Sequence, residues 1–412
     1  MRQTLINLMA RYLRWCARRV LGRAPQGTPI IGITGSTGKT STKELMGLMV
    51  REKLGNSVIV SAGNLNNEIG LPLAILGFAE VPSFWQIPII KIKALWRALT
   101  MNPASAYVLE YGVDHPGDMD FLLSVARPTD AVLTNITPVH LEYFPSLEGL
   151  VAEKLKLAAA ANTIIINSDD KRFAAADLSN KKVYKFGKAD CELQVKNIKL
   201  ADDTTTFTVK YKGREADFAI GALGEQHVMS ALPAILYGYI NGYTDEMIRT
   251  SILKYKPLPG RGIVIDGAKG STIIDESYNA NPLSVEMTLR VLGKIEKNPK
   301  IAVLGDMLEL GNKSQEEHKR VLELASDIAD LVVTIGPRMK EAGLADRSFL
   351  SPQEAGEYLS ERVEKGAVVL VKGSQSMRME FISLRLMRDP SKAAEFLPRQ
   401  NARWLRTPFK PT

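Results

Sequence analysis

The sequence predicts an α/β protein in which a doubly wound P-loop central domain is followed by a Rossmann-like C-terminal domain. Short β-branched runs alternate with helical stretches, which is the pattern of a parallel sheet covered by helices. A glycine-rich segment, GITGSTGKTST, follows the first run and opens a helix. Prolines and glycines cluster in KPLPGRG, between two sets of such runs. We therefore expect a basic amphipathic helix at 1–27, a central nucleotide-binding domain at 28–257 and a C-terminal domain at 258–412.

The composition is that of a globular protein, and the charge indicates an anionic partner. The chain has 412 residues, of which 45% are hydrophobic and 24% are charged, and its formal net charge is +8. The two cysteines, Cys16 and Cys191, match no metal-binding spacing. Free thiols suit a reducing compartment, so we expect a cytoplasmic protein. No uncharged apolar run reaches 18 residues, which predicts that the chain has no transmembrane helix.

The first segment, RQTLINLMARYLRWCARRVLGR, predicts a basic amphipathic helix. Arginines interrupt its apolar run, which argues against a cleavable signal peptide. Two interpretations stay open: a helix that lies on an anionic membrane surface at the inner face, and a helix that packs on the protein's own body. The expected apolar face consists of Leu5, Met9, Tyr12, Leu13, Cys16 and Val20, and the opposite face carries Arg11, Arg14 and Arg18.

The central domain shows five β-branched runs separated by helical segments. Residues 191–220 differ, because two-residue alternation and turn residues predict a small antiparallel piece there. Helix returns at 224–240. The five expected strands are 29–34, 57–62, 106–112, 130–136 and 163–167.

An insertion at 80–103 is longer than a connection between neighbouring strands requires. Its sequence, PSFWQIPIIKIKALWRALTM at 82–101, combines aromatic and basic residues. That combination is typical of a helix at a membrane interface, and it also suits an ordinary amphipathic helix that covers the sheet. Both interpretations stay open.

The C-terminal half repeats the alternation of strands and helices after the proline–glycine cluster. We expect a second α/β unit with a parallel sheet of its own. The expected strands are 271–276, 300–306, 331–336 and 367–373.

The glycine-rich segment predicts a phosphate-binding loop whose first glycine is displaced. The general pattern G-x-x-x-x-G-K-[ST] would place a glycine at Ile33, and the chain has it at Gly35 instead. Backbone N–H groups and the start of the following helix would stabilise phosphate charge, Lys39 would reach the β- and γ-phosphates, and the Thr40 hydroxyl would bind Mg²⁺. The predicted nucleotide-binding residues are Thr34, Gly35, Ser36, Thr37, Gly38, Lys39, Thr40 and Ser41.

The form T-G-x-x-G-K-T resembles the loop of the Mur ligase family, and further motifs follow in the family's order. They include a histidine-to-lysine segment, TPVHLEYFPSLEGLVAEK, and the stretch DESYNANPLS. The resemblance covers roughly residues 28–388. It is carried, after the loop, by 63–76, 108–119, 137–154, 257–262, 275–284, 302–311 and 370–381.

The resemblance implies an ATP-dependent amide ligase of the peptidoglycan-precursor type. Such an enzyme activates an acceptor carboxylate as an acyl phosphate, which the amine of an amino acid or dipeptide then attacks. The most similar branch adds D-alanyl-D-alanine to a UDP-muramoyl tripeptide. Alternatives are a polyglutamate- or folate-type ligase, a ligase for a lipid-linked muropeptide, and a non-catalytic membrane-associated P-loop scaffold.

The resemblance also implies two Mg²⁺ sites. Thr40 and Glu110 would hold the metal of ATP, and Glu110 stands at the carboxyl end of a predicted strand, where open sheets bind ligands. His140 and Lys154 would hold the second metal, with Lys154 carboxylated by CO₂. Such a lysine must be neutral to react, so its pKa must be low. The acidic residue that the family often has two places further on is Lys156 here.

Further site residues are implied by position in the motifs. The family's adenine-proximal motif G-x-H-N-x-x-N-A-L reads GEQHVMSAL here, so the base contacts of this chain are left open. The residues expected at the nucleotide are Asn67, His227, Arg261 and Asp275, and those expected at the substrates are Asn279, Asn281, Lys372 and Ser374.

Members of the most similar branch carry a UDP-sugar-binding domain before the phosphate loop. About 28 residues precede Pro29, so we expect this domain to be lacking. The partners expected are then a muropeptide-type acceptor, an amino acid or dipeptide donor and an anionic membrane surface. No RNA-stacking signature occurs, so we expect no nucleic acid partner, and we expect a monomer.

Overall fold

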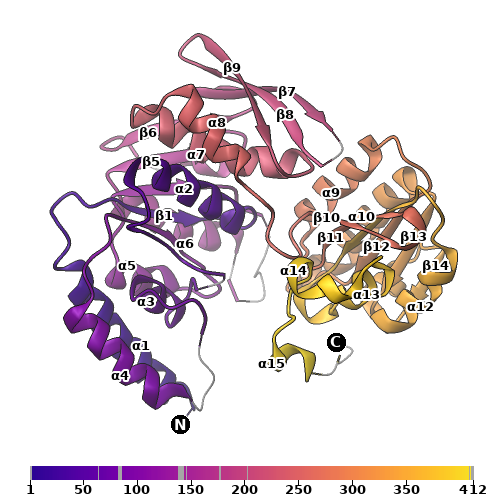
Figure 1. Ribbon diagram of the computed structural model, residues 1–412, viewed down its shortest axis with the longest axis horizontal. Coiled ribbons are helices and arrows are strands. Elements are labelled where there is room, and N and C mark those ends of the chain that lie inside the picture. The colour runs from indigo at the N-terminus through magenta and orange to yellow at the C-terminus, as the bar shows by residue number, and fades with distance from the viewer. Residues whose placement is uncertain are drawn as a thin grey trace. The chain divides into compact units, whose positions relative to one another are not determined.

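The computed structural model describes residues 2–63, 65–81, 86–137, 143–144, 146–175, 178–201, 203–407 and 409. The chain divides into two compact units (Figure 1). Unit 1 contains residues 1–198, 207–219 and 227–255, and unit 2 contains 199–206, 220–226 and 256–412.

Unit 1 is built on a nine-stranded sheet in the order β2-β3-β1-β4-β5-β6-β7-β8-β9. Its first six strands and β7 pair in parallel, which confirms the doubly wound class. The turn at Lys212–Gly213 joins β8 to β9 with only two residues. Because only antiparallel strands can be joined by so short a turn, β8 and β9 are antiparallel. The strands are β1 Ile30–Thr34, β2 Val58–Val60, β3 Ala106–Glu110, β4 Asp130–Leu133, β5 Thr163–Asn167, β6 Lys182–Gly187, β7 Leu193–Leu200, β8 Thr205–Tyr211 and β9 Arg214–Ile220.

One strand of this sheet, β6, was not predicted. Its sequence KVYKFG places Lys182 and Lys185 among the apolar residues, and only its last two residues are buried. Such a segment lacks the continuous apolar run by which the buried parallel strands could be recognised.

Helices cover this sheet and fill the predicted connections. The helix α2 starts directly behind the glycine-rich loop, and its Gly47 lies against Val60 of β2, where a Cβ atom would approach to 2.6 Å. The helices of unit 1 are α1 Arg2–Leu21, α2 Lys39–Leu54, α3 Gly70–Ile75, α4 Ile87–Thr100, α5 Asp118–Val125, α6 Leu147–Ala160, α7 Glu225–Ile240 and α8 Asp245–Leu253.

The first helix packs on the body of unit 1, beside α4, α3 and α5. Of its predicted apolar face, Leu13, Cys16 and Val20 are fully buried, whereas Leu5 is exposed. Most of the stripe that could have faced a membrane is therefore a packing face. Figure 1 shows α1 and α4 side by side at the lower left.

Unit 2 holds a six-stranded sheet in the order β10-β11-β15-β12-β13-β14. The four predicted strands are present and parallel, and two short strands were missed: β10, which pairs antiparallel with β11, and β14 at the other edge. The elements are β10 Ile263–Asp266, β11 Thr272–Glu276, β12 Lys300–Gly305, β13 Leu331–Ile335, β14 Arg347–Phe349 and β15 Val368–Lys372, with α9 Pro282–Lys294, α10 Ser314–Ile328, α11 Pro337–Ala342, α12 Pro352–Arg362, α13 Glu380–Leu386, α14 Ala393–Phe396 and α15 Ala402–Leu405.

Across the described part of the chain, no helix is both long enough and apolar enough to cross a bilayer.

The packing of α1 generates a stability prediction. Replacing the fully buried Leu13 by alanine leaves a cavity, which costs about 2–5 kcal/mol. The matched control is Leu8→Ala on the same helix, where the side chain is 57% exposed and the cost is within about 0.5 kcal/mol. We expect Leu13→Ala to lower the melting temperature by at least about 4 °C. Thermal melting followed by circular dichroism checks this, and equal melting of the two variants would contradict the packing role of α1.

Candidate active site

The glycine-rich loop joins the end of β1 to the start of α2 and is held against the end of β4. Gly38, the residue before α2, has φ 77°, a left-handed conformation that favours glycine. Asn135 anchors the loop, because its backbone oxygen accepts from the Ser36 N–H at 2.7 Å and its Oδ1 accepts from the Thr37 N–H at 2.9 Å. The Thr134 hydroxyl donates to the Thr37 carbonyl at 2.7 Å. The loop is thus clamped in one conformation.

The structure explains the displaced glycine. Gly35 has φ 150°, and a Cβ atom built on it would lie 2.0 Å from Oγ1 of Thr134 and 2.9 Å from the backbone oxygen of Asn135. No side chain fits there unless the end of β4 moves. Gly35 therefore permits the close approach between the loop and β4.

The Lys39 side chain folds back over the loop. Its ammonium donates to the backbone oxygens of Gly35 at 2.9 Å and Ser36 at 3.2 Å. This places a positive charge beside the first turn of α2, where backbone N–H groups also carry partial positive charge. The loop thus offers an anion the two features that phosphate recognition needs.

A polar cluster lies at the first turn of α2 and the end of β3. The Thr40 hydroxyl donates to Glu110 Oε2 at 3.0 Å, and both residues are buried. Asn66 holds the other carboxylate oxygen, with its Nδ2 3.0 Å from Oε1. The predicted pair Thr40 and Glu110 is therefore brought together, and Asn66 is a partner that sequence reasoning missed in favour of its neighbour Asn67.

A second missed residue is Lys43, one turn further along α2. It is fully buried, donates to the Gly63 carbonyl at 3.0 Å and lies 3.9 Å from Glu110 Oε2. It also pairs with Glu44 at 3.2 Å. A buried lysine requires such partners. The spacing of Lys39 and Lys43 by one helical turn was the sequence signal that could have pointed to it.

Lys154, on α6, lies next to the loop. It is 1% exposed, and its ammonium is 3.2 Å from the Gly35 carbonyl oxygen, which also accepts from Lys39. Burial and then the Lys39 charge lower the pKa of Lys154 to about 7, against the opposing effect of the acidic side chains of Asp114, Glu153 and Glu110. The prediction of a low-pKa lysine at this position is thus matched by its surroundings.

Lys156 occupies the position where the family often has an acidic residue, and its ammonium group forms ion pairs with two neighbouring carboxylates. Its ammonium lies 2.6 Å from Asp120 and 2.7 Å from Glu153, and hydrogen bonds to these carboxylates raise the pKa of Lys156. Glu153 is buried and also accepts from the N–H groups of Gly117 at 3.0 Å and Met119 at 2.9 Å. The lysine therefore balances a buried carboxylate directly before Lys154 in the sequence.

Three other residues of unit 1 were predicted at the site, namely Asn67, His227 and His140. Asn67 is exposed, and its Oδ1 accepts from the N–H of Gly70, the first residue of α3, at 2.8 Å. His227 is buried on α7, with its Nδ1 3.4 Å from the Tyr255 hydroxyl. His140 lies outside the described residues. Within the ranges that the structure describes, no three His, Cys, Asp or Glu side chains lie close enough to hold a metal ion.

The predicted residues of unit 2 gather at the carboxyl ends of β11 and β15. Lys372 is buried, and its ammonium lies 3.2 Å from Glu276 Oε2 and 3.2 Å from the Asn279 carbonyl oxygen. The Ser374 hydroxyl accepts from the Leu308 N–H at 2.9 Å. Asn281 caps α9 through Ser284, with Oδ1 3.0 Å from the Ser284 N–H. Lys372 and Asn279 are thus in contact, whereas the Asn281 side chain serves the helix.

Asp275 is fully buried at the same edge. Ser277 donates to its Oδ1 at 2.9 Å and Ser383 donates to its Oδ2. Burial raises its pKa to about 6, and these hydrogen bonds oppose the rise. Arg261 stacks its guanidinium over the ring of Tyr278, 4.1 Å from the centroid. Glu276, the partner of Lys372, was not singled out from the sequence.

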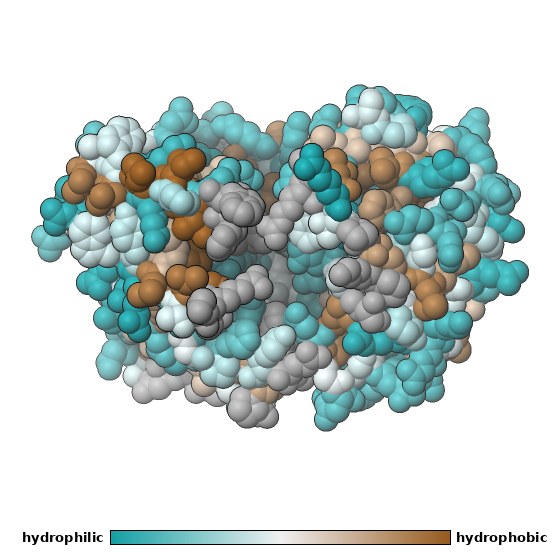
Figure 2. Space-filling view, turned by 90° about the horizontal axis from the view of Figure 1, so that it is seen from below, coloured by the Kyte–Doolittle hydropathy of each residue, from teal (hydrophilic) through white to brown (hydrophobic). Residues whose placement is uncertain are grey.

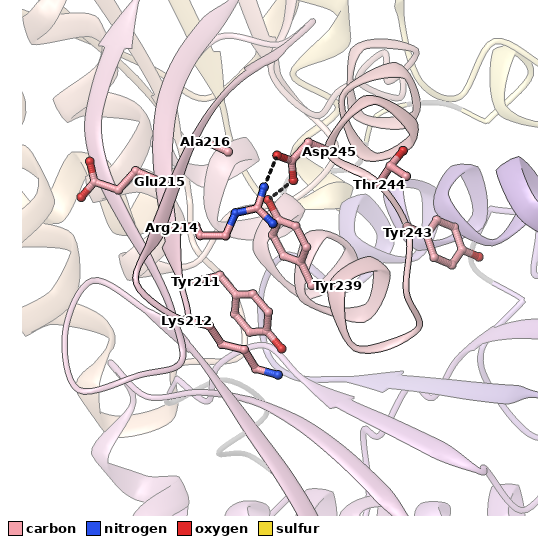
Figure 3. Close-up of a pocket in the computed structure, with 9 residues that line it drawn as sticks. All are labelled: Tyr211, Lys212, Arg214, Glu215, Ala216, Tyr239, Tyr243, Thr244 and Asp245. Carbon is pink, nitrogen blue, oxygen red and sulfur yellow. Dashed lines mark hydrogen bonds and ion pairs between the residues drawn. The ribbon is translucent and has the colours of Figure 1, made fainter.

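A hollow elsewhere in unit 1 has a different character. It measures about 460 Å³ and lies among β8, β9, α7 and α8 (Figure 3). The rings of Tyr211 and Tyr239 stack at 4.9 Å, and Arg214 pairs with Asp245 at 3.5 Å. Its lining shares no residue with the phosphate loop or with the predicted site.

The chain matches the two Mur ligase domains in order. The Mur ligase middle domain matches residues 33–238, and the Mur ligase, glutamate ligase domain matches residues 260–375. The UDP-N-acetylmuramoyl-tripeptide–D-alanyl-D-alanine ligase of Bacillus subtilis is 31% identical over an alignment of 380 residues, which covers 88% of this chain and 77% of that protein. The enzyme of the same name from Escherichia coli is 27% identical over 85% of this chain and 75% of its own length.

Solved structures agree with this assignment at the level of fold. A MurF ligase from Thermotoga maritima in complex with ADP superposes with a TM-score of 0.79 at 24% identity, covering 94% of this chain and 84% of that one. MurF from Acinetobacter baumannii superposes with a TM-score of 0.78 at 24% identity, and the match covers 92% of this chain and 80% of that one. The chain therefore belongs to the Mur ligase family, whose members are ATP-dependent amide ligases.

Proposed function

We propose that this ligase joins the carboxylate of a muropeptide-type acceptor to the amine of an amino acid or dipeptide, with D-alanyl-D-alanine as the donor and a UDP-muramoyl tripeptide as the acceptor. The observation that carries the proposal is the arrangement of Lys39, Thr40, Glu110 and Lys154 around the Gly35 loop. The names of the relatives support the substrate pair. The folate-type alternative has support from fold likeness alone, at 15% identity.

In this proposal the loop from Thr34 to Ser41 binds the phosphates of ATP. Because the N–H groups of Ser36 and Thr37 donate to Asn135, the N–H groups at the start of α2 meet the phosphates, and Lys39 swings from the loop carbonyls to the phosphate oxygens. An acceptor carboxylate and the γ-phosphate repel each other, so positive charge fixed between them lowers the barrier. Lys39 supplies part of that charge.

The chemistry of the donors at the cluster fits Mg²⁺. The Thr40 hydroxyl and the Glu110 carboxylate are oxygen donors 3.0 Å apart, and Mg²⁺ prefers oxygen ligands. When bound, the metal ions would offset the charge of the phosphates during transfer. We propose His140 and a carboxylated Lys154 as ligands of a second ion. In this scheme Asn66 orients Glu110, and Glu153 with Lys156 fixes the part of α6 that carries Lys154.

The remaining predicted residues keep the roles that the resemblance implies. Asn67, His227, Arg261 and Asp275 are proposed at the nucleotide. The pair Lys372 and Asn279, with Asn281 and Ser374, is proposed at the substrates, because Lys372 is a buried cation at a strand end that could meet the donor carboxylate.

We further propose that the enzyme works in the cytoplasm as a monomer, and that it includes the helix at 1–27, the central domain at 28–257 and the C-terminal domain at 258–412. The free cysteines Cys16 and Cys191 support a reducing location.

The substrate proposal is tested by phosphate release from ATP with a panel of acceptors and donors. We expect release to depend on both a UDP-muramoyl tripeptide and D-alanyl-D-alanine, with mass spectrometry showing the joined product. L-alanyl-L-alanine and glutamate serve as matched control donors. If glutamate stimulated phosphate release as strongly as D-alanyl-D-alanine, the enzyme would be assigned to the polyglutamate type. If no acceptor–donor pair stimulated phosphate release, the proposed ligase function would be contradicted.

The close approach at Gly35 generates a second prediction. Gly35→Ala must displace Thr134 or the loop, so at least one hydrogen bond to a phosphate is lost, worth about 1.5–3 kcal/mol. We expect ATP binding to weaken by roughly 10- to 150-fold in calorimetry. The control is Gly213→Ala, at φ 81° but with open space around the added methyl group. Unchanged affinity in Gly35→Ala would contradict the phosphate-binding role.

The third prediction concerns Lys154. With a pKa of about 7, roughly half of its amines are neutral at pH 7, against about one in three thousand at the ordinary value of 10.5. We expect ¹³C-bicarbonate to give a carbamate signal in nuclear magnetic resonance that grows as the pH rises through about 7. Lys154→Gln should remove the signal and lower turnover at least about a hundredfold.

The control for this experiment is Lys182→Gln, which changes an exposed lysine on β6 of the same unit. It should keep the carbamate signal and most of the turnover. A signal that persists in Lys154→Gln, or unchanged turnover in that variant, would refute the proposed role.

A further inference from the structure

Exposed apolar side chains are concentrated on two helices of unit 1. Among the described residues, fifteen large apolar side chains are exposed, and eight of them belong to α1 and α4. Figure 2, a view from below, shows apolar side chains gathered at the left, where these helices lie. We name this surface the α1–α4 face, and it consists of Leu5, Leu8, Trp15, Ile89, Ile92, Leu95, Trp96 and Leu99.

Helix α4 is apolar on both sides. Its inward side chains Ile90, Ala94 and Ala98 are buried in the core of the unit. Ile89, Ile92, Trp96 and Leu99 recur at intervals of three and four residues, so they form one outward stripe. Ile92 is 71% exposed and Trp96 is 62% exposed. A surface helix normally places polar residues outward, so this stripe indicates a partner.

Helix α1 presents arginines and a tryptophan outward. A hollow of about 310 Å³ is lined by Arg11, Arg14, Trp15, Arg18 and Arg19, with no carboxylate among them. Four guanidinium groups around one hollow favour an anion, and arginine suits phosphate oxygens in particular.

All the charged residues of α1 and α4 are positive. In sequence, α1 has five arginines and α4 has Lys91, Lys93 and Arg97, and neither helix has an aspartate or glutamate. These eight basic residues equal the whole formal net charge of the chain, +8. The positive charge and the exposed apolar side chains are thus on the same two helices.

The two helices are fixed to each other, so the face exists before any partner binds. The Tyr12 hydroxyl donates to the Lys91 carbonyl at 2.7 Å. Arg23, just after α1, donates to the carbonyl oxygens of Ala98 at 2.6 Å and Met101 at 2.8 Å. The binding of a partner therefore does not require these helices to fold at that moment.

We propose that the α1–α4 face docks on the surface of an anionic lipid bilayer, with the apolar side chains in the acyl boundary and the arginines at the phosphate headgroups. An anionic bilayer satisfies both properties of the face, because it offers an apolar layer directly beneath a negative one. A second copy of the chain would set eight positive charges against eight others. Nucleic acid would leave the isoleucine and leucine side chains without an apolar partner.

The test uses flotation of the full chain with vesicles, which requires no turnover and is therefore independent of the ligase assignment. We expect binding to phosphatidylglycerol–phosphatidylcholine vesicles at least about tenfold stronger than to pure phosphatidylcholine, and weaker binding at high salt. Arg11→Gln, Arg18→Gln and Arg19→Gln together should reduce binding at least about tenfold. Ile92→Ser with Trp96→Ser should reduce it at least about tenfold as well.

Two matched control variants carry comparable substitutions outside α1 and α4. Leu253→Ser with Leu350→Ser removes two other exposed apolar side chains, and Lys313→Gln, Lys340→Gln and Lys365→Gln remove three exposed charges. Both control variants should bind vesicles like the wild type, and all variants should show the wild-type circular dichroism spectrum.

Several results would overturn the proposal. They are no vesicle binding, equal binding to neutral vesicles, loss of binding in both control variants, and competition by inorganic phosphate at millimolar concentration. A dimer in light scattering that Ile92→Ser with Trp96→Ser dissociates would assign the face to a second copy. Tighter binding to a single-stranded RNA oligonucleotide than to vesicles would assign it to nucleic acid.

Discussion

The candidate site depends on the contact between Gly35 and the end of β4. Because no side chain separates the loop from Thr134 and Asn135, the loop backbone is held by hydrogen bonds from a neighbouring strand. The Gly35 carbonyl oxygen then faces the interior of the site and accepts from both Lys39 and Lys154. One backbone atom thus brings together residues that are 115 positions apart in the chain. The low pKa of Lys154 follows partly from this proximity, since the Lys39 charge opposes a second positive charge.

Buried charge in unit 1 is organised in the same way around this loop. Lys43 beside Glu110, and Lys156 beside Glu153, each place a cation next to a buried carboxylate. A buried carboxylate without such a partner would be costly. Lys154 differs, because burial and the Lys39 charge outweigh its acidic neighbours and lower its pKa. A lowered pKa suits a lysine to chemistry, whereas the other two lysines balance charge.

Much of the fold and the conformation of the candidate phosphate loop could be predicted from sequence, because both depend on local patterns. The buried parallel strands are continuous β-branched runs, and the loop motif places Lys39 and Thr40 at the start of a helix. Asn66, Lys43 and Glu153 were missed because their roles depend on contacts with residues on other elements. The strand β6 was missed because its lysines hide the apolar pattern. For α1 the helical wheel predicted the apolar stripe and not its partner, since α4 lies about 65 residues further along the chain.

The order of α1 and α4 in the chain has a consequence for biosynthesis. Helix α1 ends at Leu21 and α4 ends at Thr100, so a ribosome that adds 5–20 residues per second completes α4 roughly 4–16 s after α1. During that interval Leu13, Cys16 and Val20 have no α4 to pack against, and the nascent helix is apolar on one side and basic on the other. Such a segment partitions readily to an anionic surface. In the docking that we propose, the first contact with a membrane can therefore precede the completion of the fold.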